Sequence, residues 1–235
     1  MIKKLSTYLK EGFSYTGLEI TGPEEERVFF LLVLKKSRNQ LLIVDKKTVS
    51  SLEELPKLVD RKNPLLLCIN TPNILTKKVN AENGNNLDAL VNQAFPNIDL
   101  NSIYYEVIQK ERAPIVVMSQ KKAVDPILKK LNELDIKVSN FSLGISAMEN
   151  VTPFLEEESI QVSNHQLHFS DKTITEITMN NSTDNLLYTI SGLELSSSYL
   201  LSFSLILGNL NQKTSASNFN DINEALKSRF KNFRI

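Results

Sequence analysis

Residues 116–144 read VVMSQKKAVDPILKKLNELDIKVSNFSLG, and this stretch decides the fold class. Its two ends are apolar and rich in β-branched residues, as strands are, whereas its middle repeats apolar residues at helical spacing. We therefore predict a strand, a helix and a second strand, with one face of the helix packed against a sheet. The apolar helix positions are Val124, Ile127, Leu128, Leu131 and Leu134.

The helix is predicted to start at Asp125 and Pro126, because the missing N–H of proline costs nothing in a first helical turn. The residues that precede it, SQKKAVD, contain no glycine. They therefore lack the glycine-rich loop that cradles a phosphate group at the start of a helix. The strand–helix–strand unit is predicted to pack the fold and to carry no chemistry.

Residues 1–80 are predicted to form the N-terminal part of a ribonuclease-H-like lobe, to which residues 121–145 return. Ser51 is the predicted N-cap of a short helix that Pro56 interrupts. The order strand, strand, strand, helix, strand is that of the first half of such a lobe. The predicted elements are an antiparallel meander over 15–21, 26–37 and 39–49, the helix over 50–62, and a buried strand over 64–72.

The rest of the chain divides into an insert, a second lobe and a tail. Residues 81–120 are predicted to form a small inserted α+β subdomain, and residues 146–210 a reduced second lobe. Residues 211–235 are expected to be a polar and basic tail, which precedes a membrane helix in the full-length protein. The second lobe is expected to contain a short helix over 145–155, a strand–turn–strand over 159–181, one strand over 185–195 and an apolar helix over 198–210.

The composition argues against several classes of function. Lys+Arg and Asp+Glu are each 27, so the net charge gives no electrostatic footprint for nucleic acid, and no nucleic-acid partner is expected. The single cysteine, Cys68, lies in an apolar strand and is predicted to be buried and inert. One cysteine makes no intramolecular disulfide, and no signal peptide is visible, which together favour a soluble cytoplasmic chain.

No catalytic residue or metal site is predicted. His165 and His168 stand three apart in a strand-like pattern, which directs their side chains to opposite faces. The carboxylates of residues 156–158 are typical of a solvated loop, and no serine sits in a G-x-S-x-G elbow.

Four stretches together resemble the cytoplasmic actin-like proteins of type II secretion and type IV pilus machines, the secretion L protein and the pilus M protein. They are LLLCINTPNILTKKV (65–79), LDALVNQAFPNIDLNSIYYEVI (87–108), residues 116–144, and YLLSFSLILGNL (199–210). The resemblance implies two ribonuclease-H-like lobes related to actin. In actin-like ATPases, an Asp-x-Gly turn in each lobe binds phosphate and magnesium.

Both of these turns depart from the family pattern here. Glu19 stands at the aspartate position of the first lobe, Thr21 takes the place of glycine, and Gly22 comes one residue late. In the second lobe, Asn164 and His165 occupy the turn. The acidic run at 24–26 would repel phosphate and is otherwise a solvated turn or a docking patch. We therefore expect no cofactor, no metal and no enzymatic activity, with Glu19 as a degenerate phosphate-loop position.

The resemblance implies a scaffold that docks the assembly ATPase and links it to inner-membrane partners, at the cytoplasmic face of the bacterial inner membrane. In the secretion branch the ATPase packs against the second and third cytoplasmic subdomains, although no motif here locates the contact residues. A homodimer is a further option. Two alternatives remain open: a nucleotide-binding actin-like ATPase of the pilus M type, and a stand-alone adaptor with a ribonuclease-H-like fold outside secretion.

Overall fold

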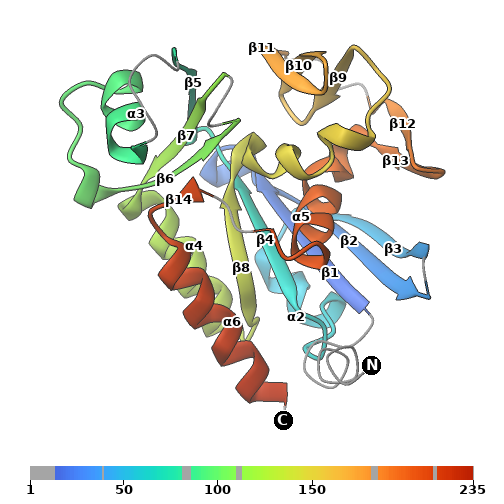
Figure 1. Cartoon of the computed structure of the whole chain (residues 1–235). Coiled ribbons are helices and arrows are strands. Elements are labelled where there is room, and N and C mark those ends of the chain that lie inside the picture. The colour runs from blue at the N-terminus through green and yellow to red at the C-terminus, as the bar shows by residue number, and fades with distance from the viewer. Residues whose placement is uncertain are drawn as a thin grey trace.

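The computed structural model describes residues 14–38, 40–80, 86–109, 113–180, 185–213 and 216–234. Over these residues the chain forms a central five-stranded sheet, a four-stranded sheet, a three-stranded sheet and a two-stranded hairpin. Figure 1 shows helices packed around the central sheet, and the three smaller sheets gathered beyond one of its ends.

The central sheet has the strand order of a ribonuclease-H-like lobe. The order is β3-β2-β1-β4-β8, in which the first three strands form an antiparallel meander and β4 and β8 run parallel to β1. The predicted α/β actin-like fold class is confirmed by this topology. The strands are β1 (Ser14–Thr21), β2 (Val28–Ser37), β3 (Gln40–Val49), β4 (Leu65–Asn70) and β8 (Val138–Leu143).

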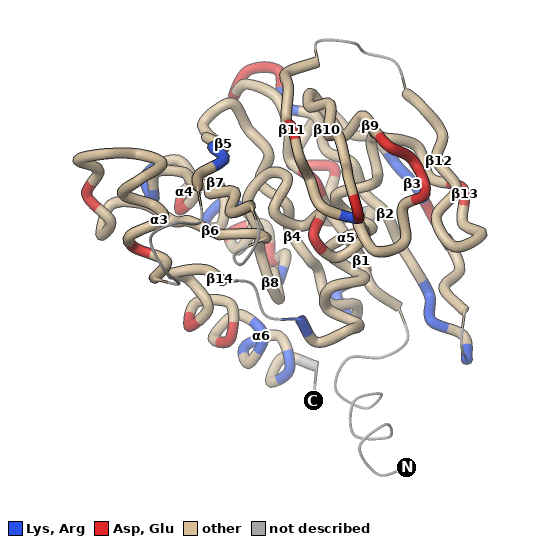
Figure 2. The backbone as a smooth tube through the Cα atoms, turned by 45° about the horizontal axis from the view of Figure 1, so that its top comes forward, with Lys and Arg blue, Asp and Glu red and all other residues tan. Residues whose placement is uncertain are grey.

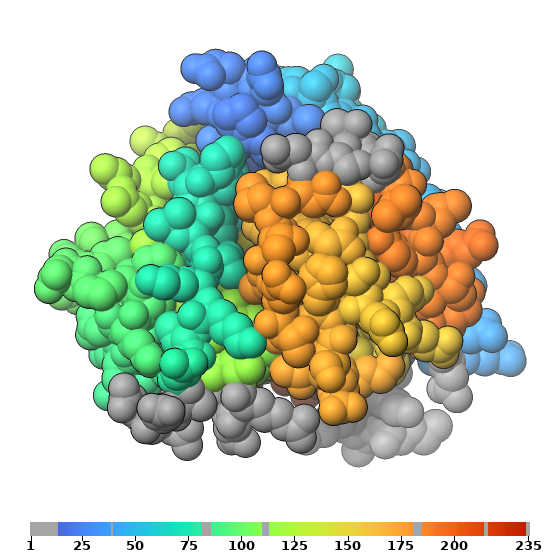
Figure 3. Space-filling view, turned by 90° about the horizontal axis from the view of Figure 1, so that it is seen from above, coloured from blue at the N-terminus to red at the C-terminus, as the bar shows by residue number. Residues whose placement is uncertain are grey.

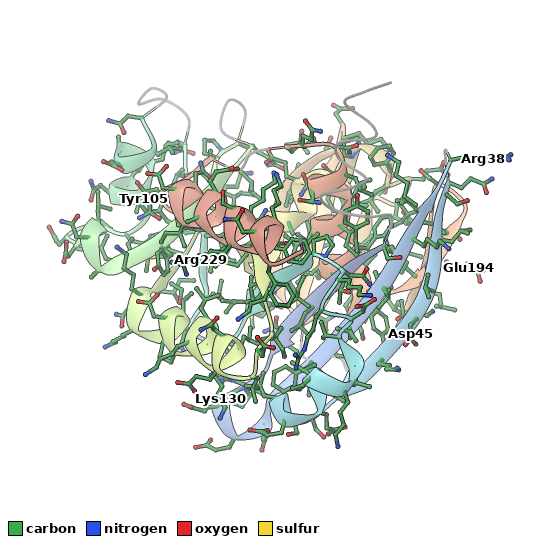
Figure 4. The ribbon with its side chains drawn as sticks, turned by 90° about the horizontal axis from the view of Figure 1, so that it is seen from below. Arg38, Asp45, Tyr105, Lys130, Glu194 and Arg229 are labelled. Carbon is green, nitrogen blue, oxygen red and sulfur yellow. The ribbon has the colours of Figure 1, made fainter. Side chains whose placement is uncertain are left out.

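Helices cover both faces of this sheet, which is why all six residues of β4 are buried. Figure 4, seen from below, places α2 and α4 on one side of the sheet and α6 on the other. Helix α5 packs across β1, β2 and β4. It lies so close to β1 that a Cβ atom on Gly17 would sit 2.7 Å from the backbone oxygen of Ser202. The helices are α2 (Leu55–Leu58), α4 (Lys121–Glu133), α5 (Leu200–Leu210) and α6 (Asn220–Arg234).

Helix α4 starts four residues earlier than predicted, at Lys121, so Pro126 lies inside it. The predicted start was wrong because proline was taken as a marker of the first turn. The apolar stripe agrees with the prediction, since Val124, Ile127 and Leu131 are buried. At the other helix, Ser51 caps the N-terminus as predicted, because its hydroxyl accepts a hydrogen bond from the backbone N–H of Glu53.

The insert has its own sheet, in the order β14-β6-β7-β5, and its own small core around Leu90 and Val91 of α3. Because β5 already pairs with β7, the insert begins inside the range predicted for the first lobe. Its elements are β5 (Leu75–Lys78), α3 (Leu87–Ala94), the 3-10 turn η4 (Leu100–Ser102), β6 (Ile103–Ile108), β7 (Ile115–Gln120) and β14 (Ala216–Ser217).

The region predicted to be a reduced second lobe forms a three-stranded sheet and a hairpin. The predicted strand–turn–strand contains three strands, because the chain also turns at Ser163, where φ is +53°. The single strand predicted over 185–195 is a hairpin, since Ser191 and Gly192 both take positive φ, as two-residue turns require. The strands are β9 (Ser159–Val162), β10 (His165–Ser170), β11 (Thr173–Met179), β12 (Leu187–Ile190) and β13 (Leu193–Ser196).

Four short 3-10 segments connect these parts. They are η1 (Glu24–Glu26), η5 (Gly144–Asn150), η6 (Thr152–Phe154) and η7 (Ser197–Tyr199), with η2 (Leu52–Glu54) leading into α2.

The C-terminal segment, for which a polar and basic tail was predicted, is a structural part of the first lobe and the insert. β14 pairs with β6, and α6 packs along β8. Phe219 and Phe230 are both buried, so the segment contributes to the core. Among the described helices, none has the length and apolar character needed to cross a membrane.

Candidate functional site

Glu19 lies where β1 ends, at the carboxyl edge of the parallel strands, which is where ligands bind in open α/β sheets. Its side chain has no exposed surface. The Nδ2 amide of Asn70, at the end of the neighbouring strand β4, donates a hydrogen bond of 2.9 Å to Glu19 Oε1. Glu19 Oε2 has no hydrogen-bond partner among the described residues.

The two turns that the resemblance predicts to be degenerate phosphate loops are in direct contact. The hydroxyl of Thr21, at the end of β1, lies 3.4 Å from the hydroxyl of Ser163, in the turn between β9 and β10. The predicted second-lobe turn, Asn164 and His165, is part of the same connection. Protein atoms therefore join the two places at which the resemblance would put phosphate loops, and Glu19 is sealed beneath them.

A second buried carboxylate, Glu106, belongs to the same polar cluster. It comes from β6 of the insert, and its Oε2 accepts hydrogen bonds of 2.7 Å from the Ser142 hydroxyl and from the backbone N–H of Leu143. These bonds fasten the insert to β8. Between the two carboxylates, the Cys68 thiol donates to the backbone oxygen of Gly144 at 3.3 Å.

The burial of the cluster controls its protonation. Burial raises the pKa of Glu19 to about 7, and the hydrogen bond from Asn70 and the nearby Ser163 hydroxyl lower it only in part. Burial also raises the pKa of the Cys68 thiol, and the charges of Glu19 and Glu106 raise it further. The thiol is therefore a neutral donor within the core, as predicted, and has no thiolate character for nucleophilic chemistry.

The cluster has the character of a structural junction. Its members come from β1, β4, β6, β8 and the β9–β10 turn, so it ties the first lobe to the insert and to the second lobe. In the part of the chain that the structure describes, His, Cys, Asp and Glu side chains form no group of three or more that could hold a metal ion. The acidic run forms η1, with three exposed glutamates that follow directly after β1.

A groove of about 400 Å³ separates the insert from the second lobe. It opens on the face seen in Figure 3, between the edge strands β5 and β11. Lys78 crosses it, because its Nζ atom donates a 2.9 Å hydrogen bond to the backbone oxygen of Thr175. Lys77, Lys78 and His165 line the groove together with apolar residues, and its lining contains no carboxylate.

The two histidines do not form a joint site. His165 is largely buried, burial lowers its pKa, and its Nδ1 atom has no hydrogen-bond partner among the described residues. His168 lies on the same strand opposite Glu176.

Sequence reasoning located Glu19 but missed most of its neighbours. Glu106 could have been recognised from the sequence, because it is a lone carboxylate in the otherwise apolar strand IYYEVI. Asn70 had a similar signal as the polar last residue of a buried strand. Ser163 had none: the adjacent turn residues Asn164 and His165 were singled out, but the contact of Ser163 with Thr21 spans 142 positions of the sequence.

Comparisons with known proteins give a likeness of fold only. No protein-family model matches the sequence, and no curated protein matches it. Among solved structures, the chain is similar to the cytoplasmic domain of EpsL, an inner membrane component of the type II secretion system of Vibrio cholerae. That alignment has 16% identity, covers 71% of each chain and has a TM-score of 0.49.

A second similar structure is a protein of Bacteroides thetaiotaomicron with an actin-like ATPase fold and unknown function. Here the identity is 13%, the alignment covers 73% of this chain and 70% of the other, and the TM-score is 0.41. Independently of these likenesses, the strand order of the central sheet gives the α/β topology of a ribonuclease-H-like lobe.

Proposed function

We propose that the chain is a non-catalytic, actin-like scaffold of a type II secretion or type IV pilus-like machine. The contact between Thr21 and Ser163 above the buried Glu19 carries the proposal. A phosphate group needs backbone N–H donors, a metal ion or cations at this position. The chain instead offers a buried carboxyl group and, just beyond it, three exposed glutamates, which disfavour a bound nucleotide.

In this role the chain docks the assembly ATPase and links it to inner-membrane partners at the cytoplasmic face of the membrane. The sequence resemblance supports this assignment. The four stretches of sequence on which the resemblance rests form ordered elements of the insert, of the first lobe and of α5. The resemblance implies an ATPase contact on the second and third subdomains. The groove between β5 and β11 is the surface proposed for that contact, because it lies between the insert and the reduced second lobe.

The second candidate, a nucleotide-binding ATPase of the pilus M type, is less well supported. It requires the two lobes to separate at the Thr21–Ser163 contact and Glu19 to ionise next to a phosphate group. The burial that raises the pKa of Glu19 opposes that ionisation.

A co-purification experiment tests the scaffold role. The chain is mixed with the assembly ATPase encoded by the same genome, and complex formation is followed by size-exclusion chromatography. We expect a complex that the groove substitution Lys78→Glu weakens at least tenfold, and that the matched substitution Lys122→Glu on the exposed side of α4 leaves intact. No complex at micromolar concentrations of both proteins would contradict the role.

A further inference from the structure

The described strand edges of this protein are closed in different ways, and one long edge is left open. The outer edge of β8 is closed by Asn223 of α6, and that of β6 by β14 and Asn218. The edge of β9 is capped by the hydroxyl of Tyr188, which accepts from the backbone N–H of Gln161. At β11, the side-chain amide of Gln109 bonds both backbone groups of Ile174.

The exception is β3, which has ten residues and forms one edge of the central sheet. No described residue makes a hydrogen bond to its outer backbone groups. The edge of β5 is also open, but β5 has four residues and carries two lysines, a pattern that blunts an edge against pairing. A ten-residue edge with unpaired N–H and C=O groups is a template for an additional strand.

One face of β3 is exposed and apolar at its centre. Leu42 is 46% exposed and Val44 is 58% exposed, and both lie on the exposed face of the strand, with Lys46 further along. Val44 lies in a β-bulge and pairs with no residue of β2, because Val33 pairs with Asp45 and Leu34 with Ile43. Its side chain is therefore available for contacts outside the sheet.

The charges around this edge indicate which kind of chain fits it. Residues 28–49 carry five cations and one carboxylate, Asp45, which already pairs with Lys47 at 2.8 Å. Figure 2 shows Lys and Arg residues at the far tip of the β2–β3 hairpin, where Figure 4 places Arg38, whereas Lys46 and Lys47 lie further along β3, near Asp45. Two copies of so basic an edge repel each other, whereas an acidic strand is attracted. The cations are Lys35, Lys36, Arg38, Lys46 and Lys47.

We propose that β3 binds an extended segment of a partner protein as a sixth strand of the central sheet, and that one face of this segment carries apolar residues followed by an acidic residue. Apolar side chains of that segment pack on Leu42 and Val44, and a carboxylate on the same face meets Lys46, since side chains of neighbouring strands align face by face. Lys35 stands beside Leu42 in the ladder and supplies a second cation. Backbone hydrogen bonds along the edge supply affinity that does not depend on sequence.

This surface adds a partner to the proposed scaffold role but stands on its own geometry. The central sheet places β3 at the edge opposite β8, and β3 contributes no residue to the groove between β5 and β11. Loss of the ATPase contact therefore leaves the β3 site intact, and absence of the β3 site leaves the ATPase contact intact.

Binding of synthetic peptides to the full chain tests the proposal. The probe is a fluorescent nine-residue peptide that presents valine, valine and glutamate in order on one strand face and threonine on the other, measured by anisotropy at low salt. We expect a Kd in the range of tens to hundreds of micromolar (about −5 to −6 kcal/mol). The same peptide with lysine in place of glutamate, and the same peptide N-methylated on two consecutive residues so that both strand edges are blocked, are each expected to bind at least tenfold more weakly. Equal binding of either control would overturn the proposal, because it would show that charge or strand pairing is irrelevant.

Two matched variants and hydrogen exchange locate the site. Lys46→Glu is expected to weaken the acidic peptide at least tenfold, whereas Lys122→Glu, an equal charge change on α4, is not. Bound peptide should protect backbone amides within residues 40–48 from exchange. Protection confined to 75–78 and 173–179 would overturn the proposal by moving the site to the groove. Concentration-dependent protection of 40–48 without peptide would show that a second copy occupies the edge, which also contradicts it.

Discussion

The two edges of the central sheet contrast sharply. At the β8 edge, the side chain of Asn223 donates to the backbone oxygen of Phe141 at 3.0 Å and accepts from its N–H at 2.9 Å, as a neighbouring strand would. Phe219 stacks on Phe141 with ring centroids 4.4 Å apart. At the β3 edge, no described residue makes comparable hydrogen bonds to the strand backbone or a comparable aromatic stack, and apolar side chains remain exposed.

The difference shows that the C-terminal segment has a structural task. One segment, residues 216–234, closes the edges of both the central sheet and the insert, and does so largely with asparagine side chains. An asparagine amide carries one donor and one acceptor group side by side, which matches the paired N–H and C=O of a strand edge. An edge left unsealed by such a chain is therefore a candidate for pairing with a partner.

The largest expected effect is at the sealed edge. Phe219→Ala removes the ring that stacks on Phe141 and meets Tyr104 edge-on at 5.5 Å. Because Phe219 has no exposed surface, we expect a loss of about 3–5 kcal/mol in the free energy of unfolding, measured by urea denaturation. Phe154→Ala is the control, since this ring is 42% exposed. Equal losses in the two variants would mean that the C-terminal segment does not close the sheet.

The next effect depends on pH and concerns Glu19 in the buried polar cluster. The pKa of Glu19 is about 7 in the folded protein against an ordinary 4.5, so the folded state holds the proton more tightly. The stability from this proton is fully present below pH 4.5 and is lost as the pH rises through 7, about 3 kcal/mol in all. Glu19→Gln removes this dependence, so the difference between variant and wild type should grow in favour of the variant from pH 5 to pH 8. Parallel curves in urea titrations at each pH would contradict the buried, largely unpaired carboxyl group.

A smaller loss is expected from Asn223→Ala, which deletes both side-chain bonds to the β8 edge. Two buried backbone groups of Phe141 then lack partners, at a cost of about 2 kcal/mol. Asn232→Ala on the exposed side of the same helix should change the unfolding free energy by less than about 0.5 kcal/mol. Faster amide exchange at residue 141 in the first variant alone would sharpen the assignment. Unchanged exchange would refute it.

The smallest effect is expected at the open edge. Val44→Lys should change the free energy of unfolding by less than about 0.5 kcal/mol, because more than half of the side chain is already exposed. A loss above about 1 kcal/mol in urea denaturation would mean that Val44 is covered in solution and that the edge is not open.

The elements with strong local patterns could be predicted from sequence, and those that depend on distant contacts could not. The meander, the buried β4 and the apolar face of α4 follow from periodicity. The two-residue β14 exists only through its pairing with β6, more than a hundred positions away in the sequence. Helix α6 does carry apolar residues at helical spacing, Ile222, Leu226 and Phe230, and Phe219 directly precedes it. The many polar residues between them led to the prediction of a tail.

The sequence pointed to Glu19 but not to the residues that surround it in the structure. The comparison with Asp-x-Gly turns led to Glu19, because that pattern is local. Its partners Asn70 and Ser163 come from other elements, and only the folded sheet brings them together. Glu106 could have been singled out, since a carboxylate inside an apolar strand needs a buried partner.

The most direct test of the account is calorimetric titration of the purified chain with ATP and magnesium. The account predicts no binding at millimolar nucleotide, because Glu19 is buried and the two turns that would hold phosphate contact each other. Micromolar binding that is lost in Glu19→Ala would contradict it and would identify the chain as a nucleotide-binding member of the actin-like proteins.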